Sequence, residues 1–581
     1  MKQKRKENKS APPTPVFNRT WLNWILAFAA AAVTLQVYSP ALDGPFVFDD
    51  SYLPMNSPKL ANQGLMAWIS GVRPVLMATY YVNHAIARTS TFGFHVWSIL
   101  FHVGCAIFIF LVSRRILKYA GVREDFAWFT ALVFLLHPVQ TEVVAYIAGR
   151  SESVSSLFFY AAFALFLYRP SPEIKWARVA AVFALFGLAL ASKEHTVTLP
   201  VLLLLTDFFW NPGFTLAGIK RNWRLHAPVL AGAALGGILV LRRIDPSAGF
   251  SIEGLRWYEY LFTQFRVIWE YVRIFLLPVG LSADYDYPIS HTIAEHGAAF
   301  GLAGLLLVTA AALYYARRFP LASYGWLIFL LLLAPTSSLV PIKDPIADRR
   351  LYLPMLGLLL IAVDGLRRLP LSRKAMGAAI AAVSLAAATL TYQRASVWGN
   401  TIALWEDTVA KSPRKSRAHF QLAHAYFTAG RCQDALREYE AVSKLEKPDD
   451  ALLIDWGLAY VCLDQAEPAV EKFEAAAKIK PTAHVYSQIG LAYGKVGRAV
   501  DARKALEKAL AIDPNYDMTY VYLGHLFLTA NNPAQAIRFY EKALALNPDN
   551  PVAPEFLATA KSRFEQQQQQ NPAVSITPTP R

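Results

Sequence analysis

The sequence predicts an all-α protein in which a polytopic bundle of membrane helices is followed by a solenoid of short helix pairs. Of its 581 residues, 55% are hydrophobic and only 17% are charged, whereas soluble proteins are about a quarter charged. Long apolar runs fill residues 21–392, and a repeat of about 34 residues fills 416–550. These two patterns define the two parts of the chain.

The charge is distributed unevenly between the parts. Residues 397–581 hold 21 basic and 21 acidic side chains, so the net charge of +15 belongs to residues 1–396. Excess Lys and Arg in a membrane segment marks the cytoplasmic loops. We therefore expect no nucleic-acid partner. The basic segment 1–20 precedes an apolar run without a small-residue cleavage site, which predicts a retained anchor with a cytoplasmic N-terminus.

Eleven apolar runs are candidate membrane spans, although several are shorter than the ~20 residues that cross ~30 Å of hydrocarbon. With eleven spans, every basic loop cluster falls on the cytoplasmic side, and everything after residue 392 falls outside it. The same count makes 73–87 and 257–277 helices of the outer surface, because both mix aromatic and charged side chains. The eleven runs are 21–38, 96–113, 125–138, 143–168, 177–191, 196–210, 227–241, 298–316, 321–340, 351–366 and 375–392.

The repeats have small residues at one fixed position. Ala423, Gly457, Gly490 and Gly524 are spaced 34, 33 and 34 residues apart, and an aromatic residue follows three residues after each. Small residues where two helices touch, with aromatic residues filling the groove, are typical of tetratricopeptide repeats. We predict a leading half-repeat over 397–415, four repeats over 416–550, a capping helix over 551–565 and a disordered tail over 566–581.

Arrays of this kind bind peptides along a concave face and have no chemistry of their own. The repeats are therefore expected to hold a protein segment. By repeat position, the candidate binding residues are Phe420, His424 and Phe427, together with Gln488.

The three cysteines, Cys105, Cys432 and Cys462, form neither a disulfide framework nor a metal motif. A bond between Cys432 and Cys462 is the less favoured alternative, and it requires that the repeats are exported.

Acids, bases and histidines gather in the predicted outer loops. Asp49 and Asp50 stand about ten residues past the first apolar run. An ionised carboxylate near lipid loses hydration, so an acid pair at this place requires an explanation. A solvated turn is the alternative. This arrangement suits a reaction in which one substrate is held in the lipid. The other candidates in or beside these loops are Arg73, His137, Glu142, Arg150, Glu152, Lys193, Glu194, Arg349 and Arg350.

Six motifs occur in order before the repeats: Asp49-Asp50, Arg73-Pro74, His137 to Glu142, Gly149 to Glu152, Ser192-Lys193-Glu194 and Asp348 to Pro354. This order resembles that of the transmembrane and tetratricopeptide repeat-containing O-mannosyltransferases, including their bacterial relatives. The resemblance extends from about Trp21 to Phe564. It implies a GT-C-type glycosyltransferase that takes a sugar from a polyprenyl or dolichyl phosphate on the extracytoplasmic face.

By the same resemblance, Asp49 or Asp50 activates the acceptor hydroxyl, and basic residues among Arg150, Lys193, Arg349 and Arg350 hold the lipid phosphate. His137 and Glu142 contact the sugar or support the base. The chain departs from related sequences in having His195 after Glu194, and Gln140 where His is common. Transfer to a Ser or Thr hydroxyl independently requires a base near the nucleophile and cations on the departing phosphate.

Two other functions remain open: a glycosyltransferase acting on a lipid or cell-wall glycan, and a membrane-anchored scaffold without chemistry. The scaffold explains neither eleven spans nor the acids on the outer face. We expect the bacterial inner membrane with periplasmic repeats, or alternatively the endoplasmic reticulum with lumenal repeats. Asp284 and Asp286 leave a divalent metal as a less favoured alternative, because two aspartates at this spacing are common in loops, so no metal ligand or other cofactor is assigned.

Overall fold

The computed structural model describes residues 20–57, 59–241, 252 and 254–570, and within them the chain is helical without any β-strand. This confirms the all-α prediction. The chain divides into two compact units, residues 1–404 and 405–581. Most of the predicted basic N-terminus and residues 571–581 of the predicted tail lie outside the described residues.

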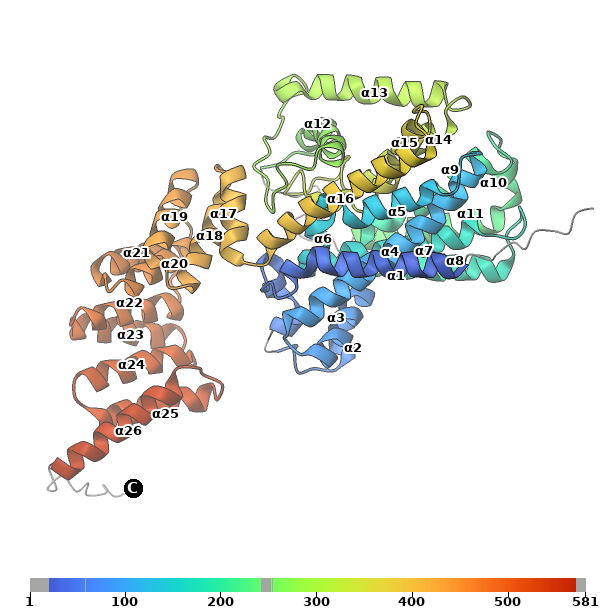
Figure 1. Cartoon of the computed structure of the whole chain (residues 1–581). Helices are drawn as coiled ribbons and strands as arrows, with labels where there is room; N and C mark the ends of the chain where they lie inside the picture. The colour runs from blue at the N-terminus through green and yellow to red at the C-terminus, as the bar shows by residue number, and fades with distance from the viewer. Residues whose placement is uncertain (1–19, 58, 242–251, 253, 571–581) are drawn as a thin grey trace, which may run out of the picture. The chain divides into compact units, whose positions relative to one another are not determined.

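The first unit is a bundle built around α4 (Thr91–Tyr119), which packs against α5 (Phe126–Leu136) and α7 (Arg150–Leu167) (Figure 1). Its other apolar helices coincide with the remaining predicted runs, because an apolar segment in lipid must satisfy its own backbone hydrogen bonds, as a helix does. These helices are α1 (Thr20–Tyr38), α8 (Trp176–Leu190), α9 (Leu199–Trp210), α11 (Trp223–Leu241), α13 (Ala298–Tyr314), α14 (Pro320–Leu333), α15 (Met355–Leu366) and α16 (Arg373–Trp398).

Helices α14 and α15 pack closely because glycines face each other across their contact. A Cβ atom at Gly325 would lie 2.6 Å from the Gly357 carbonyl oxygen, and one at Gly357 would lie 2.4 Å from that of Gly325. Small residues that let two backbones approach are a common device for joining helices within a membrane.

The span count of eleven is not confirmed. Four described helices are long and apolar enough to cross a membrane: α1, α4, α13 and α16. A fifth span results if α5 and the segment Pro138–Ala145 form one bent unit, with a bend of 50°. The bend lies at His137-Pro138, where proline disfavours a helical conformation of the residue before it. Several of the predicted spans are therefore shorter apolar helices.

Two further helices match the segments predicted for the outer surface, namely α3 (Pro74–Ala87) and α12 (Trp257–Leu276). In α12, Tyr260, Val267 and Tyr271 are buried on one face, while Trp257 is exposed. Such a helix is suited to a boundary between protein and lipid headgroups. The side of the membrane on which both helices lie stays a prediction.

The second unit is a tetratricopeptide array of four helix pairs. A Cβ atom at Gly457 would lie 2.5 Å from the Phe473 ring, and one at Gly524 would lie 2.4 Å from the Tyr540 ring. This close approach explains the small residue at that repeat position. The pairs are α18 (Ser416–Thr428) with α19 (Cys432–Leu445), α20 (Asp450–Cys462) with α21 (Ala466–Ile479), α22 (Ala483–Lys495) with α23 (Ala499–Ile512), and α24 (Asp517–Thr529) with α25 (Pro533–Leu546).

Helices also stand at both ends of the array. α17 (Thr401–Lys411) lies within the predicted half-repeat. α26 (Ala553–Gln570) continues past the predicted capping helix, so the prediction of disorder is wrong for 566–570. Glutamine is a good helix former, and the Gln567 amide donates to the Asn531 carbonyl and side-chain oxygens, which ties this turn to the array.

Cys432 and Cys462 form a disulfide with a Cα–Cα distance of 6.3 Å. The favoured expectation of unpaired cysteines is therefore wrong. Cys432 begins α19 and Cys462 ends α20, and the helical repeat brings these two ends together although they are 30 residues apart in sequence. Cys105 is a free, buried cysteine.

Thiol labelling of the denatured full-length protein, extracted with thiols blocked, checks this bond. We expect one reactive cysteine before reduction and three afterwards. Replacing Cys432 with Ser should destabilise the repeats by about 3 kcal/mol, because the unfolded chain loses a closed loop. Cys105→Ser is the control and leaves the reductant-sensitive part of the melting curve unchanged. Three reactive thiols before reduction would contradict the disulfide.

Candidate active site

The acid pair lies in a short 3₁₀ helix, η2 (Phe48–Tyr52), after α1. Asp50 is only 1% exposed. Its two carboxylate oxygens accept hydrogen bonds from the backbone N–H groups of Val47 at 3.1 Å and Ala148 at 2.7 Å. The Asn56 amide donates to the Asp50 carbonyl at 2.8 Å. Asp50 therefore joins η2 to a segment almost a hundred residues away and has a positioning role.

Asp49 differs from Asp50 because it is exposed. A 3₁₀ helix has 3.0 residues per turn, so Asp49 shares its face of η2 with Tyr52, which is 87% exposed. Phe48, immediately before it, has a φ of +54°, a conformation that costs about 1–3 kcal/mol in a residue with a side chain. Asp49 is thus exposed on a segment whose backbone is fixed by the hydrogen bonds to Asp50.

Burial raises the pKa of Asp50 to about 7, and the neighbouring Asp49 contributes to the increase. The hydrogen bonds from Val47 and Ala148 act in the opposite direction because they stabilise the carboxylate. Asp50 is thus partly protonated near neutral pH. This limits the repulsion that two adjacent carboxylates would otherwise exert on each other.

Three predicted site cations of the first unit are each bound to a carboxylate. Arg73 donates to both oxygens of Glu194, at 2.9 Å each. Lys193 lies 2.5 Å from Glu152. Arg349 binds Glu142 through its guanidinium and also through its backbone N–H, at 2.8 Å. The ion pairs connect α3, α6 (Thr141–Ala145), α7, η6 (Glu194–Thr198) and η8 (Asp348–Leu351).

The three cations share one electrostatic environment. Burial lowers the pKa of Lys193, Glu152 opposes this decrease, and the charges of Arg73 and Arg349 add to it. The side chains of Arg73, Lys193 and Arg349 stay 36%, 16% and 23% exposed, respectively. The structure thus brings six predicted site residues from distant parts of the sequence into one partly open cluster.

Tyr146, which belongs to none of the sequence motifs, links the acid pair to this cluster. Its hydroxyl oxygen accepts a hydrogen bond from the Asp49 backbone N–H at 3.0 Å. Its ring packs on Phe48 and Trp398, with centroid distances of 6.4 and 5.7 Å. The only sequence signal was its position between the motifs that contain Glu142 and Arg150.

His195 was noted in the sequence only as a departure from related chains. It is buried, neither ring nitrogen has a hydrogen-bond partner, and Nε2 lies 3.4 Å from Glu152. Burial lowers its pKa to about 4, so the ring is neutral at physiological pH. Because the ring is neutral, the positive charge that pairs with Glu152 comes from Lys193 and not from His195.

Two predicted phosphate ligands, Arg150 and Arg350, lie in packed surroundings. Arg150 is fully buried; its guanidinium donates to the Asn83 side chain at 2.9 Å and the Phe94 carbonyl at 2.7 Å, and lies 4.7 Å from the Tyr80 ring centroid. Arg350 donates to the backbone carbonyls of 344 and 345 at 2.6 and 2.9 Å. Both guanidinium groups thus bind acceptors within the protein itself, and their predicted role in holding the phosphate stays a prediction.

His137 also has a packing role. Its ring stacks on Phe275 with centroids 5.6 Å apart, and its Nε2 lies 2.9 Å from the Phe275 carbonyl oxygen. The contact joins the bend after α5 to the end of α12. That His137 contacts the sugar or supports the base stays a prediction.

Some candidate residues of the repeats are accessible, and others are used in packing. His424 is exposed and Phe427 is half-buried. Phe420 packs on Tyr439 with a centroid distance of 5.9 Å, and the buried Gln488 donates to the Tyr522 hydroxyl at 3.3 Å. Phe420 and Gln488 thus contribute to packing between helices, and His424 is the candidate most open to a ligand.

Asp284 and Asp286 belong to no group of metal-ligating side chains. In the described part of the chain, no three His, Cys, Asp or Glu side chains converge as a metal site would require. The interactions that hold the candidate active site together are hydrogen bonds and ion pairs between its own residues.

These features define a class of protein: a membrane helical bundle that contains a cluster of ion pairs and is followed in the same chain by a tetratricopeptide array. Residues 481–549 match the family model "Tetratricopeptide repeat". The protein O-mannosyl-transferase F38B6.6 of Caenorhabditis elegans is 25% identical over 71% of this chain and 62% of its own. Human protein O-mannosyl-transferase TMTC3 is 22% identical over 82% of this chain and 58% of its own.

Human protein O-mannosyl-transferase TMTC1 is 24% identical over 72% of this chain and 55% of its own length. The chain therefore spans little more than half the length of the curated relatives it matches. Among solved structures, the tetratricopeptide protein TTC0263 of Thermus thermophilus matches 31% of the chain and 94% of its own, with 21% identity and a TM-score of 0.25. The relatives confirm the predicted family: the chain is a relative of the transmembrane and tetratricopeptide repeat-containing O-mannosyltransferases.

The different environments of Arg150 and Arg73 predict different effects of the same substitution. Arg150→Gln leaves buried acceptors without a partner and should cost about 3 kcal/mol of unfolding free energy. Arg73→Gln breaks a partly exposed pair and should cost about 1 kcal/mol or less. Thermal unfolding of the two variants in the same detergent measures this difference. Equal losses would mean that Arg150 has no special packing role.

Proposed function

We propose that this protein is a membrane glycosyltransferase that moves a sugar, mannose by family resemblance, from a polyprenyl or dolichyl phosphate carrier to Ser or Thr hydroxyls of a protein. One observation carries the proposal: the exposed carboxylate Asp49 lies on a backbone that is joined through Tyr146 to Glu142, and Glu142 binds Arg349, one of three partly exposed cations that act on one another. A base and a set of cations are the two components that the reaction requires.

Asp49 is the general base in this proposal. It takes the proton of the acceptor hydroxyl as the hydroxyl oxygen attacks the anomeric carbon of the sugar, and the bond from that carbon to the phosphate oxygen breaks. Asp50 acts through Asp49, because its two backbone hydrogen bonds fix η2. The proposal thus chooses between two acids that the sequence alone leaves equivalent.

Arg73, Lys193 and Arg349 hold the phosphate of the carrier and stabilise the negative charge that it gains on leaving. Glu194, Glu152 and Glu142 orient these cations through the ion pairs. The paired carboxylates also reduce the cost of placing three positive charges together in a region of low dielectric constant.

We assign the reaction and the repeats to the extracytoplasmic side on two grounds. Basic loops fall on the opposite side when the eleven apolar runs are taken as spans. In addition, disulfides form and persist in oxidising compartments, and Cys432 and Cys462 are bonded. The second ground is independent of the span count.

The repeats present the acceptor in this proposal. Tetratricopeptide arrays bind extended segments of protein, and His424 is exposed on the first repeat. The relatives whose names describe protein O-mannosyl transfer match this chain through both the bundle and the repeats. A protein acceptor explains why one chain combines the two units.

Substitution of the two aspartates separates a base from a positioning residue. Asp49→Asn should lower kcat for sugar transfer about 10²-fold or more, with little change in melting temperature, because the exposed base is lost. Asp50→Asn replaces one acceptor oxygen with a donor and should lower the melting temperature as well as the rate. The assay uses purified protein, polyprenyl-phosphate mannose and Ser/Thr-containing peptides. Full activity of Asp49→Asn would exclude it as the base.

Arg73 tests the phosphate assignment. Arg73→Gln should raise KM for the lipid-linked donor about tenfold and leave KM for the peptide unchanged, since charged hydrogen bonds to phosphate contribute about 1.5–3 kcal/mol. Arg123→Gln is the control, because Arg123 forms an exposed ion pair with Asp125. If the two variants have the same donor KM, Arg73 does not bind the phosphate.

A further inference from the structure

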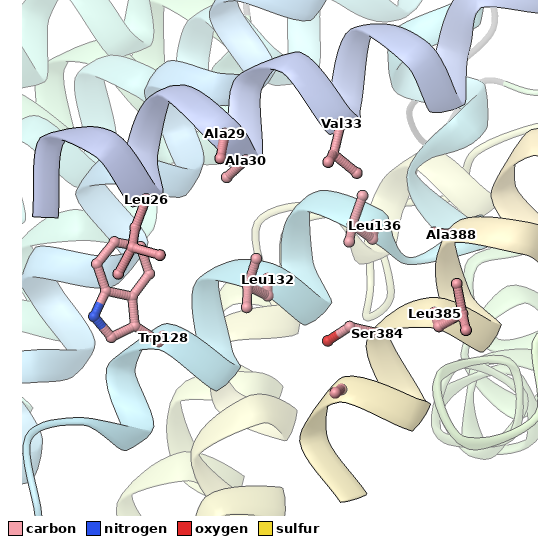
Figure 2. A pocket seen from close by; sticks show the side chains of 11 residues that line it. Leu26, Ala29, Ala30, Val33, Trp128, Leu132, Leu136, Ser384, Leu385 and Ala388 are labelled. Atoms are coloured by element: carbon pink, nitrogen blue, oxygen red, sulfur yellow. The ribbon is translucent and has the colours of Figure 1, made fainter. Parts of the chain in front are cut away.

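An apolar groove lies among α1, α5 and α16 (Figure 2). Its volume is about 540 Å³. Each helix contributes one stripe of side chains at helical spacing, and all the side chains except Ser384 are apolar. The stripes are Leu26, Ala29, Ala30 and Val33 of α1; Trp128, Leu132 and Leu136 of α5; and Ala381, Ser384, Leu385 and Ala388 of α16.

Small side chains produce this hollow. The lining includes Ala29 and Ala30 of α1 and Ala381 and Ala388 of α16. Trp128 stands beside Leu26 at one end of the groove, and Leu385 and Ala388 lie towards the other end (Figure 2). Leu26, Val33 and Leu385 are exposed although they are large and apolar. α1 and α16 each have the length and hydropathy of a membrane span. A groove between two helices of this kind opens towards hydrocarbon when they span the membrane, and its apolar lining suits a hydrocarbon chain.

The groove leads towards the candidate active site. Leu136 is the last residue of α5, and the chain then bends through Pro138 into α6, where Glu142 binds Arg349. Beyond the groove, α16 continues to Trp398, whose ring packs on Tyr146. The Thr391 hydroxyl donates to the Leu136 carbonyl at 2.7 Å and fixes α16 to α5 between the groove and the site.

We propose that this groove binds the polyprenyl chain of the donor while its phosphate lies at the cations of the active site. This inference rests on the proposed function and adds the place of the lipid. From Leu136 to Trp128 the groove extends about 12 Å along α5 at 1.5 Å per residue. A short isoprenoid chain attached at the site therefore fills at most the end next to Leu136, and a long chain also reaches Trp128 and Ala381.

Two adjacent alanines of α16 provide a matched pair of variants. Ala381 lines the groove, Ala382 does not, and both are exposed. Ala381→Phe should raise KM about tenfold for a long-chain polyprenyl-phosphate mannose, because it displaces buried methylene groups of the chain. With the long-chain donor, kcat should not change. With citronellyl-phosphate mannose, which has two isoprene units, KM should not change either. Ala382→Phe should change neither KM.

Two outcomes of this assay would overturn the proposal. One is an unchanged KM of Ala381→Phe for the long-chain donor. The other is an equal increase for both donors, since a general disturbance of the fold does not distinguish chain length.

A binding experiment separates this proposal from the proposed function, because it needs no sugar transfer. A polyprenyl phosphate with a photoreactive group near the chain end is crosslinked to the full-length protein in detergent. The expected crosslinks lie near Leu26, Trp128 or Ala381 and are displaced by unlabelled polyprenyl phosphate. Crosslinks elsewhere would overturn the proposal. Equal displacement by a two-chain phospholipid would also do so, because the groove would then hold bulk lipid.

Discussion

The two hydrogen bonds accepted by the buried Asp50 carboxylate determine the geometry of the candidate site. They come from Val47, just before the acid pair, and Ala148, just before α7. An unpaired backbone N–H at such depth would be costly, so the carboxylate satisfies two buried donors while it joins two loops. Asp49, Tyr146 and the segment that carries Glu142 all take their positions from this junction. The strain at Phe48 is tolerated because the junction overdetermines the local backbone.

Long-range pairing also explains why the cations and carboxylates occur together. A buried charge without a partner loses several kcal/mol of solvation. Arg73, Lys193 and Arg349 each offset this loss by pairing with a glutamate from a distant part of the sequence. Arg150 solves the same problem with neutral groups: a side-chain amide, a carbonyl and the faces of aromatic rings. Cations that are alike in the sequence thus have different accessibility.

Local patterns in the sequence predict the helices and the repeats, whereas the accessibility of single side chains depends on tertiary contacts. Apolar runs and the 34-residue spacing predict helices and repeats because both depend on local periodicity. The spacing also locates Gly457 and Gly524, whose lack of a Cβ admits the rings of Phe473 and Tyr540. The packing partners of Arg150, Arg350 and His137 could not be read from the sequence because they come from tertiary contacts. Tyr146 and the pairing of Cys432 with Cys462 were missed or disfavoured for the same reason. The helix through Gln570 depends on a contact with Asn531 that composition does not reveal.

The bend at His137-Pro138 connects the apolar and ionic parts of the bundle. Proline lacks a backbone N–H and disfavours helix before it, so α5 ends at Leu136 and the next residues turn by 50°. Without this break, the residues after Leu136 would continue along the axis of α5, and Glu142 would lie further along that axis. With the break, Glu142 turns to meet Arg349, while the stripe ending at Leu136 stays in the apolar groove. One local backbone constraint therefore connects the apolar groove to the ion pair of Glu142 with Arg349, which is the arrangement that the proposed lipid-linked donor requires.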